Sequence, residues 1–475
     1  MQMHLSFSFW FVLLSFLLVS PLQGQSLSAA QKQQIHDLFK EWDSTHSPGG
    51  TIGVYQGGKL VFTEAYGMAS LEFNVPNTEQ TVYNIASVSK QVTAFSLVLL
   101  EQQGKLSLDD PVQKHLPEVP DFGEEISLRH LLHHTSGLRN FQNILAMAGW
   151  RPGDPMTNDD LLRYISRQQE LNFSPGAEYL YCNTGFNLAT AIVERITGQT
   201  FQDWTRDNIF LPLGMEDTGY REDMEVVYKN TATSYNGNSE DGFRQPLKFW
   251  TYLGNGNIYT TMDDLSRWMD NFRTHKVGGT MAIETLVTPG ILNNGDTLDY
   301  ALGIGVGEYR SLKRYSHGGS IGGYRSYLLY FPEEEIGVMI LSNFSTAGPA
   351  GKAMAIADIV LADRLAPKVE NEPETANREK PTSFTPGGDD LKALAGLYYS
   401  PELDTRYRLI ADEGRMRVKH QRHEDFFLDP IAEDEWRGSA YFFRTVKVIQ
   451  DKKGGVEGVR VSNGRVRNLW FEKIE

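Results

Sequence analysis

A proline-rich stretch divides this 475-residue chain into two parts, and each part must form a core of its own. Residues 367–388 contain four prolines and several charged side chains, with almost no large apolar ones. Segments of this composition stay extended and add nothing to a core, which is typical of a linker. We therefore expect a first domain over residues 25–366 and a second domain over residues 389–475.

Charge is distributed unevenly between these two parts. The chain has 60 acidic and 45 basic residues, but the last 87 residues carry 16 of each and are neutral. Nucleic-acid binding requires a basic surface, so we expect no nucleic-acid partner. Apolar residues make up 40% of the chain and charged residues 22%, which excludes a collagen-like or wholly disordered protein.

The first 24 residues contain no lysine, arginine, aspartate or glutamate and include the apolar run Leu5–Val19. This run is shorter than the roughly 20 residues that span a bilayer, and small residues follow it. We predict a signal peptide over residues 1–24 and a periplasmic or secreted protein without stable membrane insertion. An uncleaved N-terminal anchor is the alternative.

Apolar periodicity predicts an α+β first domain. The β-rich runs Thr51–Tyr55 and Leu60–Tyr66 predict a hairpin, and Gly323–Ser342 predicts paired strands. Val88–Leu100 predicts a buried helix and Ala353–Leu365 a second helix. Strands at both ends with helices between them favour α+β over repeated βαβ units.

The second domain is predicted to be all-β. Turn signals separate seven or eight short β-rich runs within 87 residues, which favours a small antiparallel barrel or sandwich. These runs are Ala395–Tyr399, Thr405–Ala411, Arg415–Lys419, Asp425–Leu428, Ala440–Gln450, Gly455–Val461 and Arg467–Ile474.

Ser87 and Lys90 form the only Ser-x-x-Lys motif of the chain, at the start of the helix predicted over Val88–Leu100. Residues three apart lie on one helical face. A serine hydroxyl becomes a nucleophile when a neighbouring base takes its proton, and a partly desolvated lysine can act in this way. Taken alone, the motif also fits an ordinary helix with a serine near its N-terminus.

A second motif, Tyr181-Cys182-Asn183, precedes a predicted helix start. The tyrosine can shuttle a proton if a nearby ammonium lowers its pKa, and the asparagine offers both a donor and an acceptor. The similar Tyr228-Lys229-Asn230 lies in a charged stretch and is interpreted as surface.

A third motif, His317-Gly318-Gly319-Ser320, lies just before the paired strands. Glycines there allow a substrate backbone to lie against a strand edge as an added strand. The backbone amides of Ser87 and Ser320 are then placed to form an oxyanion hole.

Together these motifs resemble the serine β-lactamase and penicillin-binding-protein superfamily. The branch that the chain resembles contains class C β-lactamases, D-Ala-D-Ala carboxypeptidases, related esterases and D-aminopeptidases. The resemblance covers about residues 30–365 and extends to residues 131–138, 210–218 and 254–268, in the family's order. The C-terminal part resembles the lipocalin-like domains that follow some peptidase members.

This resemblance implies an antiparallel sheet flanked by helices, a helical subdomain, and a small β-barrel after it. It implies Ser87 as the acyl-accepting nucleophile and Lys90 with Tyr181 as the coupled base. Asn183 would contact the substrate amide and Lys90. His317, Gly318, Gly319 and Ser320 would bind substrate, with Ser87 and Ser320 forming the oxyanion hole.

His317 takes the position where many members carry the lysine of Lys-Thr-Gly. A histidine with the usual pKa of about 6.5 is mostly neutral at pH 7. Binding of a substrate carboxylate by this residue should therefore weaken, and we expect β-lactamase activity to be weak or absent.

The sequence thus predicts an exported serine hydrolase that forms an acyl-enzyme on short peptides with D-residues or on small esters. The alternatives are a true β-lactamase or D-Ala-D-Ala carboxypeptidase, and a catalytically idle ligand-binding or sensor protein. No cofactor is expected, and the sequence indicates no particular oligomeric state. His130, His133 and His134 have metal-ligand spacing but no evident carboxylate or cysteine partner, so no metal is expected. Cys182 is interpreted as a packed small residue.

Overall fold

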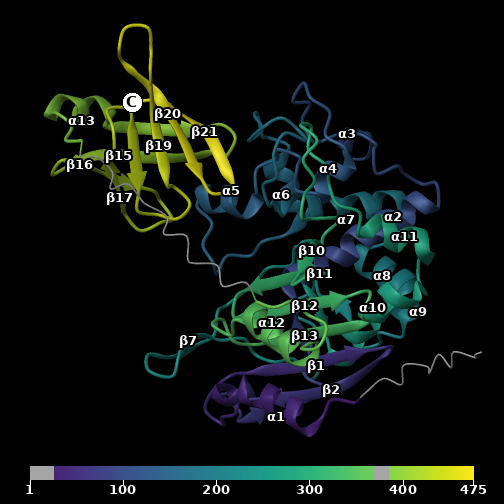
Figure 1. Cartoon of the computed structure of the whole chain (residues 1–475). Coiled ribbons are helices and arrows are strands. Elements are labelled where there is room, and N and C mark those ends of the chain that lie inside the picture. The colour runs from purple at the N-terminus through teal and green to yellow at the C-terminus, as the bar shows by residue number, and fades with distance from the viewer. Residues whose placement is uncertain (1–25, 369–383) are drawn as a thin grey trace, which may run out of the picture.

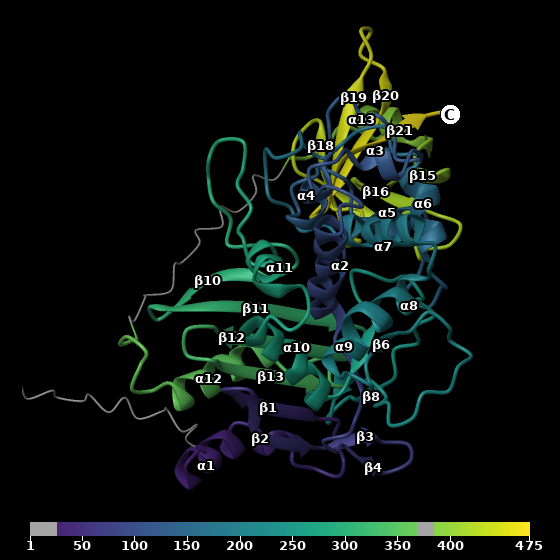
Figure 2. The ribbon, with the colours of Figure 1, turned by 90° about the vertical axis from the view of Figure 1, so that its right-hand side faces the viewer.

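The computed structural model describes residues 26–368 and 384–475. It consists of an α+β domain and a C-terminal β-barrel, which lies at the end of the molecule opposite α1, β1 and β2 (Figures 1 and 2). The α+β fold with a C-terminal barrel confirms the predicted fold class. The predicted signal peptide lies outside the described residues, as does most of the predicted linker.

The α+β domain is built on a six-stranded antiparallel sheet in the order β10-β11-β12-β13-β1-β2. Its strands are β1 (Gly50–Gln56), β2 (Lys59–Tyr66), β10 (Gly305–Tyr309), β11 (Leu312–Ile321), β12 (Tyr324–Phe331) and β13 (Ile336–Ser342). Gly50 pairs with Ser342, so segments from the two ends of the domain lie side by side. The predicted hairpin and paired strands are confirmed.

Both faces of the sheet are covered by helices. Along β13, Val338 and Ile340 join one apolar cluster while Met339 and Leu341 join the other, because successive side chains of a strand point to opposite faces. The first cluster includes α1 (Ala29–Asp37) and α12 (Pro349–Val360); the second includes α10 (Met262–Thr274). The sheet is therefore an interior layer.

Between β2 and β10 the chain forms a largely helical region. Its central helix α2 (Lys90–Gln102) is buried over most of its length and contacts α7 (Thr184–Thr197) and α11 (Gly279–Leu286). The other helices are α3 (Val112–His115), α4 (Leu128–Leu132), α5 (Phe141–Met147), α6 (Asn158–Ile165), α8 (Phe201–Thr205) and α9 (Leu211–Leu213). The short helical turns are η1 (Lys40–Trp42), η2 (Ala86–Ser89) and η3 (Arg206–Phe210).

Short strands complete this domain. The first pair is β3 (Met68–Ser70) with β4 (Val75–Pro76), and β5 (Tyr83–Asn84), β9 (Ile258–Thr260) and β6 (Gly219–Tyr220) form a small sheet. The last pair is β7 (Asn236–Asn238) with β8 (Gly242–Arg244). β5 leads directly into the turn that carries Ser87, so this small sheet fixes the approach to the site. Within the described residues, none of the helices is long and apolar enough to cross a membrane.

The C-terminal domain is a closed barrel of eight antiparallel strands preceded by α13 (Gly388–Leu394). Its strands are β14 (Gly396–Ser400), β15 (Thr405–Asp412), β16 (Arg415–Lys419), β17 (Phe426–Pro430), β18 (Glu435–Gly438), β19 (Thr445–Gln450), β20 (Val456–Asn463) and β21 (Val466–Lys473). Buried aromatic and aliphatic side chains, Tyr407, Trp436 and Phe471 among them, form its core. Sequence periodicity missed β18 because its four residues contain a single large apolar side chain, Trp436.

Candidate active site

Ser87 lies in a tight turn between β5 and the buried helix α2. The turn is a 3₁₀ segment, η2, and α2 begins only at Lys90 rather than at Val88 as predicted. Ala86 has a left-handed φ of 48°, and its backbone N–H donates to the Asn84 side chain at 2.8 Å. With three residues per 3₁₀ turn, positions i and i+3 align, and the Lys90 Nζ lies 3.2 Å from the Ser87 Oγ.

Lys90 is fully buried, and its amine also donates to the backbone carbonyl of Asn255 at 2.8 Å. Burial lowers the pKa of Lys90 well below its usual value, and repulsion from Arg465 lowers it further. A buried lysine without a carboxylate partner favours the neutral amine. Lys90 can therefore accept the proton of the Ser87 hydroxyl.

Tyr181 lies beside the same lysine, with Lys90 Nζ 5.0 Å from the centroid of its ring. Burial raises the pKa of the Tyr181 phenol, while the contact with Ser87 and the charge of Arg465 lower it less. A nearby positive charge, the condition that the sequence analysis attached to a shuttle role for this tyrosine, is present in Arg465, but desolvation outweighs its effect on the pKa. Tyr181 is therefore a neutral phenol that can relay a proton rather than a standing phenolate.

Asn183 directly precedes α7, and hydrogen bonds to residues at the start of α5 fix both its backbone and its side chain. Its backbone N–H donates to Asn140 Oδ1 at 2.8 Å, and its Nδ2 donates to Gln142 Oε1 at 3.1 Å. Its Oδ1 is buried and has no hydrogen-bond partner within the described residues. This oxygen is a free acceptor for a substrate N–H. The implied contact between Asn183 and Lys90 is not among the hydrogen bonds that the Lys90 amine makes in the described part of the chain.

Cys182 is the middle residue of this motif. Its side chain is buried, and its thiol donates to the backbone carbonyl of Leu138. Burial raises the pKa of the Cys182 thiol, so a reactive thiolate is disfavoured. The interpretation of this residue as a packed small side chain agrees with its surroundings.

His317 is part of a buried chain of hydrogen bonds. Its Nδ1 donates to the Gly318 carbonyl at 2.7 Å, so its Nε2 accepts from the Tyr300 hydroxyl at 2.9 Å. Tyr300 in turn accepts from His134 Nε2, because the backbone N–H of Cys182 donates to His134 Nδ1. Burial, with repulsion from Lys90, lowers the pKa of His317 to about 3, and the histidine is neutral.

The remaining residues of this motif alternate along β11. Gly318 and Ser320 are exposed, whereas His317 and Gly319 are buried. β10 pairs with β11 only as far as Ser316, and the edge beyond it is free to receive an added strand. A Cβ on Gly319 would lie 2.2 Å from the Ile85 carbonyl oxygen. Glycine here therefore permits close approach between β11 and the turn that carries Ser87.

A cavity of about 320 Å³ opens beside Ser87. Of the predicted site residues, Ser87, Asn183 and Ser320 line it, while Lys90, Tyr181, His317, Gly318 and Gly319 are not among its lining residues. The sequence did not indicate four further residues. These are Asn255, which binds Lys90 through its backbone, Tyr300, and the barrel residues Tyr441 and Arg465. Asn255 lies in the family-like segment 254–268 but nothing in that segment singled it out, and no motif marks the other three, because each reaches the site by tertiary contact.

A serine hydroxyl bonded to a buried lysine of lowered pKa beside a tyrosine, within this α+β fold, defines a serine hydrolase. The chain belongs to the Beta-lactamase family, whose sequence pattern matches residues 32–362. The family resemblance inferred from the motifs is thereby confirmed.

Several characterised proteins are similar to this chain. The D-aminopeptidase of Brucella anthropi is 27% identical over 425 residues, which cover 88% of this chain and 76% of that protein. The D-aminopeptidase of Gluconobacter oxydans is 25% identical over 373 residues, covering 78% and 67%. Penicillin-binding protein 4* of Bacillus subtilis is 27% identical over 327 residues, covering 66% and 72%.

Solved structures share the fold. The octameric penicillin-binding protein homologue from Pyrococcus abyssi superposes with a TM-score of 0.62 and 22% identity, covering 93% of this chain and 98% of that one. The D-amino acid amidase from Ochrobactrum anthropi SV3 gives a TM-score of 0.60 and 22% identity, covering 71% of this chain and all of that one. At this level of identity the likeness supports the fold alone.

Proposed function

We propose that this protein is an exported serine hydrolase that forms an acyl-enzyme at Ser87 and acts on small D-amino-acid peptides or small esters. The observation that carries the proposal is the 3.2 Å contact between Ser87 Oγ and the buried Lys90 amine, whose lowered pKa favours the neutral base. Export rests on the apolar segment Leu5–Val19.

In the proposed reaction, the Ser87 oxygen attacks the substrate carbonyl while Lys90, with Tyr181 as relay, takes the hydroxyl proton. The backbone amides of Ser87 and Ser320, which border one cavity, stabilise the oxyanion. Collapse breaks the bond to the leaving group, which receives that proton, and leaves an ester on Ser87. Water, deprotonated by the same base, then hydrolyses the ester and returns the proton to Ser87.

The D-amino-acid substrate class is supported by the names of two relatives, both D-aminopeptidases. A carboxypeptidase-type or β-lactamase activity is the second candidate, favoured by the similarity to penicillin-binding protein 4* of Bacillus subtilis. We expect slow or absent turnover of nitrocefin, because the buried, neutral His317 offers a β-lactam carboxylate no cation on β11, the strand along which the substrate would lie. Rapid, saturable nitrocefin hydrolysis would favour the second candidate.

Covalent labelling tests the proposal. A fluorophosphonate should label the wild-type protein, and Ser87→Ala should lose the label, because the Ser87 hydroxyl borders the cavity and lies 3.2 Å from the Lys90 amine. The control is Ser89→Ala, two residues along the same turn, whose buried hydroxyl accepts the backbone N–H of Ile258. This control should keep the label. A Ser87→Ala protein that labels as fast as wild type would refute the assignment.

A further inference from the structure

A turn of the C-terminal barrel forms part of the catalytic cavity. Gly464 and Arg465 join β20 to β21, and Arg465 lines the same cavity as Ser87. The guanidinium carbon of Arg465 lies 4.9 Å from the centroid of the Tyr181 ring. The barrel therefore places a cation beside the residues that transfer protons.

Two asparagines of the α+β domain hold this turn in place. The Asn140 backbone N–H and the Asn172 Nδ2 both donate to the Arg465 carbonyl, at 3.3 and 3.2 Å. Asn172 Oδ1 also accepts the backbone N–H of Arg467 at 2.8 Å. Asn140 Oδ1 accepts the backbone N–H of Asn183, so one side chain links the turn to the Tyr181-Cys182-Asn183 motif.

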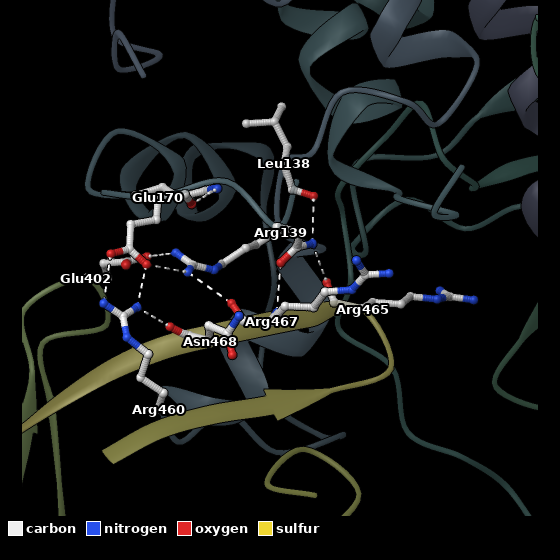
Figure 3. Close-up of polar contacts among 10 residues, drawn as sticks. Leu138, Arg139, Glu170, Glu402, Arg460, Arg465, Arg467 and Asn468 are labelled. Atoms are coloured by element: carbon white, nitrogen blue, oxygen red, sulfur yellow. Dashed lines mark hydrogen bonds and ion pairs between the residues drawn. The ribbon is translucent and has the colours of Figure 1, made fainter. Parts of the chain in front are cut away.

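Arg465 differs from the other arginines at this interface, each of which has a carboxylate partner. These pairs are Arg139 with Glu402, Arg460 with Glu170, and Arg467 with Glu178. Figure 3 shows the Arg465 side chain extending away from the Arg139–Glu402 and Arg460–Glu170 pairs. In the described ranges, no carboxylate lies within ion-pair distance of its guanidinium. A cation held in a cavity without a counter-ion is available to a ligand.

The cavity wall is positive, although the whole chain carries a net charge of −15. Over residues 26–368 and 384–475, its lining includes Arg151 and Arg465 but no aspartate or glutamate. Arg151 already lies 3.6 Å from Asp154. A free substrate ammonium is stabilised best by a carboxylate, and the described lining offers it only uncharged acceptors such as Asn183 Oδ1. A substrate carboxylate, by contrast, meets an arginine whose planar fork can bind it through two hydrogen bonds.

We infer that Arg465, supplied by the barrel, binds a carboxylate of the substrate and makes the site selective for acidic substrates over those with a free amino group. The inference rests on the proposed hydrolysis at Ser87 and narrows its substrates to D-amino-acid peptides or esters that carry a carboxylate, in contrast to the free amino end that the name aminopeptidase implies for two relatives. His317 cannot fill this role, because both of its ring nitrogens are engaged with Gly318 and Tyr300. The cation for the substrate thus comes from a second domain.

Matched ester pairs test this selectivity on the full-length protein. The first pair is mono-4-nitrophenyl glutarate and its methyl ester, with the carboxylate on the acyl side. The second pair is an N-acetyl-D-alanyl depsipeptide with a free terminal carboxylate and its terminal amide, with the carboxylate on the leaving-group side. Ser87-dependent acylation is measured for each.

Arg465→Gln should lower kcat/KM for the acidic member of at least one pair by about 10- to 100-fold, as expected for a charge-assisted hydrogen bond. With both proteins assayed on the high-pH plateau of their profiles, where the effect of Arg465 on Lys90 no longer limits the rate, the neutral member should change by less than about 3-fold, since it forms no ion pair with the guanidinium. Arg465→Lys should restore part of the preference. Arg465→Glu should reverse it towards an ester that carries a free amine.

The control is Arg460→Gln, which removes an interface charge outside the cavity and should leave the ratio within each pair unchanged. Equal losses for acidic and neutral members in both pairs on Arg465→Gln would overturn the inference and leave the hydrolase assignment intact. Absence of Ser87-dependent acylation with every ester would overturn both. Thermal unfolding of Arg465→Gln close to that of wild type shows that selectivity, and not folding, has changed.

Discussion

Lys90 is the group placed to take the proton of Ser87, because its amine lies next to the Ser87 hydroxyl. Burial lowers its pKa well below the usual value, and only the neutral amine can accept a proton. We expect kcat/KM to rise as the pH increases through the lowered pKa of Lys90. Arg465→Gln removes a repelling charge, raises that pKa, and should move the rising part of the profile to higher pH. A 4-nitrophenyl acetate pH–rate profile that does not move would contradict this.

Replacing Lys90 removes the base altogether. Lys90→Ala should lower kcat for 4-nitrophenyl acetate on the order of 10³-fold, in the range of general-base contributions. Among the described residues, the buried Lys90 amine bonds only to Ser87 and the Asn255 carbonyl and to no carboxylate, so its loss should not reduce thermal stability greatly. Near-wild-type turnover by this variant would show that another group acts as the base.

His317 affects stability at acidic pH. Its pKa is lowered to about 3 in the folded protein, whereas an unfolded histidine titrates near 6.5. Between these values the unfolded chain binds the extra proton, so stability falls as the pH decreases from about 6.5 towards 3. Each such histidine contributes a slope on the order of 1 kcal/mol per pH unit. His317→Gln should therefore flatten the dependence of the unfolding free energy on pH in this window, measured by urea unfolding. An unchanged slope would mean that His317 is already protonated in the folded protein.

At the scale of elements, β11 must approach the turn that carries Ser87. A Cβ on Gly319 would lie 2.2 Å from the Ile85 carbonyl oxygen, which is backbone and cannot rotate away. Gly319→Ala should push β11 away from η2 and lower kcat/KM for 4-nitrophenyl acetate by about 10²-fold, since catalysis tolerates little displacement.

The neighbouring glycine provides the control for this prediction. A Cβ on Gly318 would come no closer than 3.4 Å, to the Tyr327 ring, and would point outwards. Gly318→Ala should therefore cost much less activity than Gly319→Ala. Equal losses for the two variants would mean that the alanine methyl groups act on the substrate rather than on strand packing.

At the scale of the whole molecule, docking of the barrel depends on a buried ion pair. Arg139 is fully buried and pairs with Glu402 of the barrel, whose side chain is 4% exposed. Glu402→Gln removes the buried counter-ion of Arg139 and leaves only the half-exposed Glu170 at 3.7 Å, so it should lower the unfolding free energy by about 3 kcal/mol. The control variant, Glu178→Gln, breaks the pair with Arg467, in which the glutamate is 47% exposed, and should cost less than about 1 kcal/mol. Denaturant unfolding distinguishes the two, and equal costs would contradict the structure of this interface.

The elements were largely predictable because their signals are local. Alternating apolar residues marked the hairpin of β1 and β2 and seven of the eight barrel strands. The boundary between η2 and α2 was not predictable, since a 3₁₀ turn and an α-helix bury the same apolar residues. The short strand β18 was also not predictable, because its own sequence has little strand signal. Pairing with β17 and β19 in the closed barrel makes residues 435–438 a strand.

The sequence by itself determined the α+β fold with a barrel, and it placed Ser87 and Lys90 on one turn, because a spacing of three acts within a single element. Only the tertiary structure decided how those groups behave. Burial lowers the pKa of Lys90, and the Asn255 carbonyl accepts a hydrogen bond from its amine. The Tyr300 hydroxyl donates to Nε2 of His317, so this nitrogen is not available to a substrate. The charge next to Tyr181 comes from Arg465, which the fold of a second domain carries into the first. Desolvation and charge depend on which remote segments meet, and no local spacing encodes that.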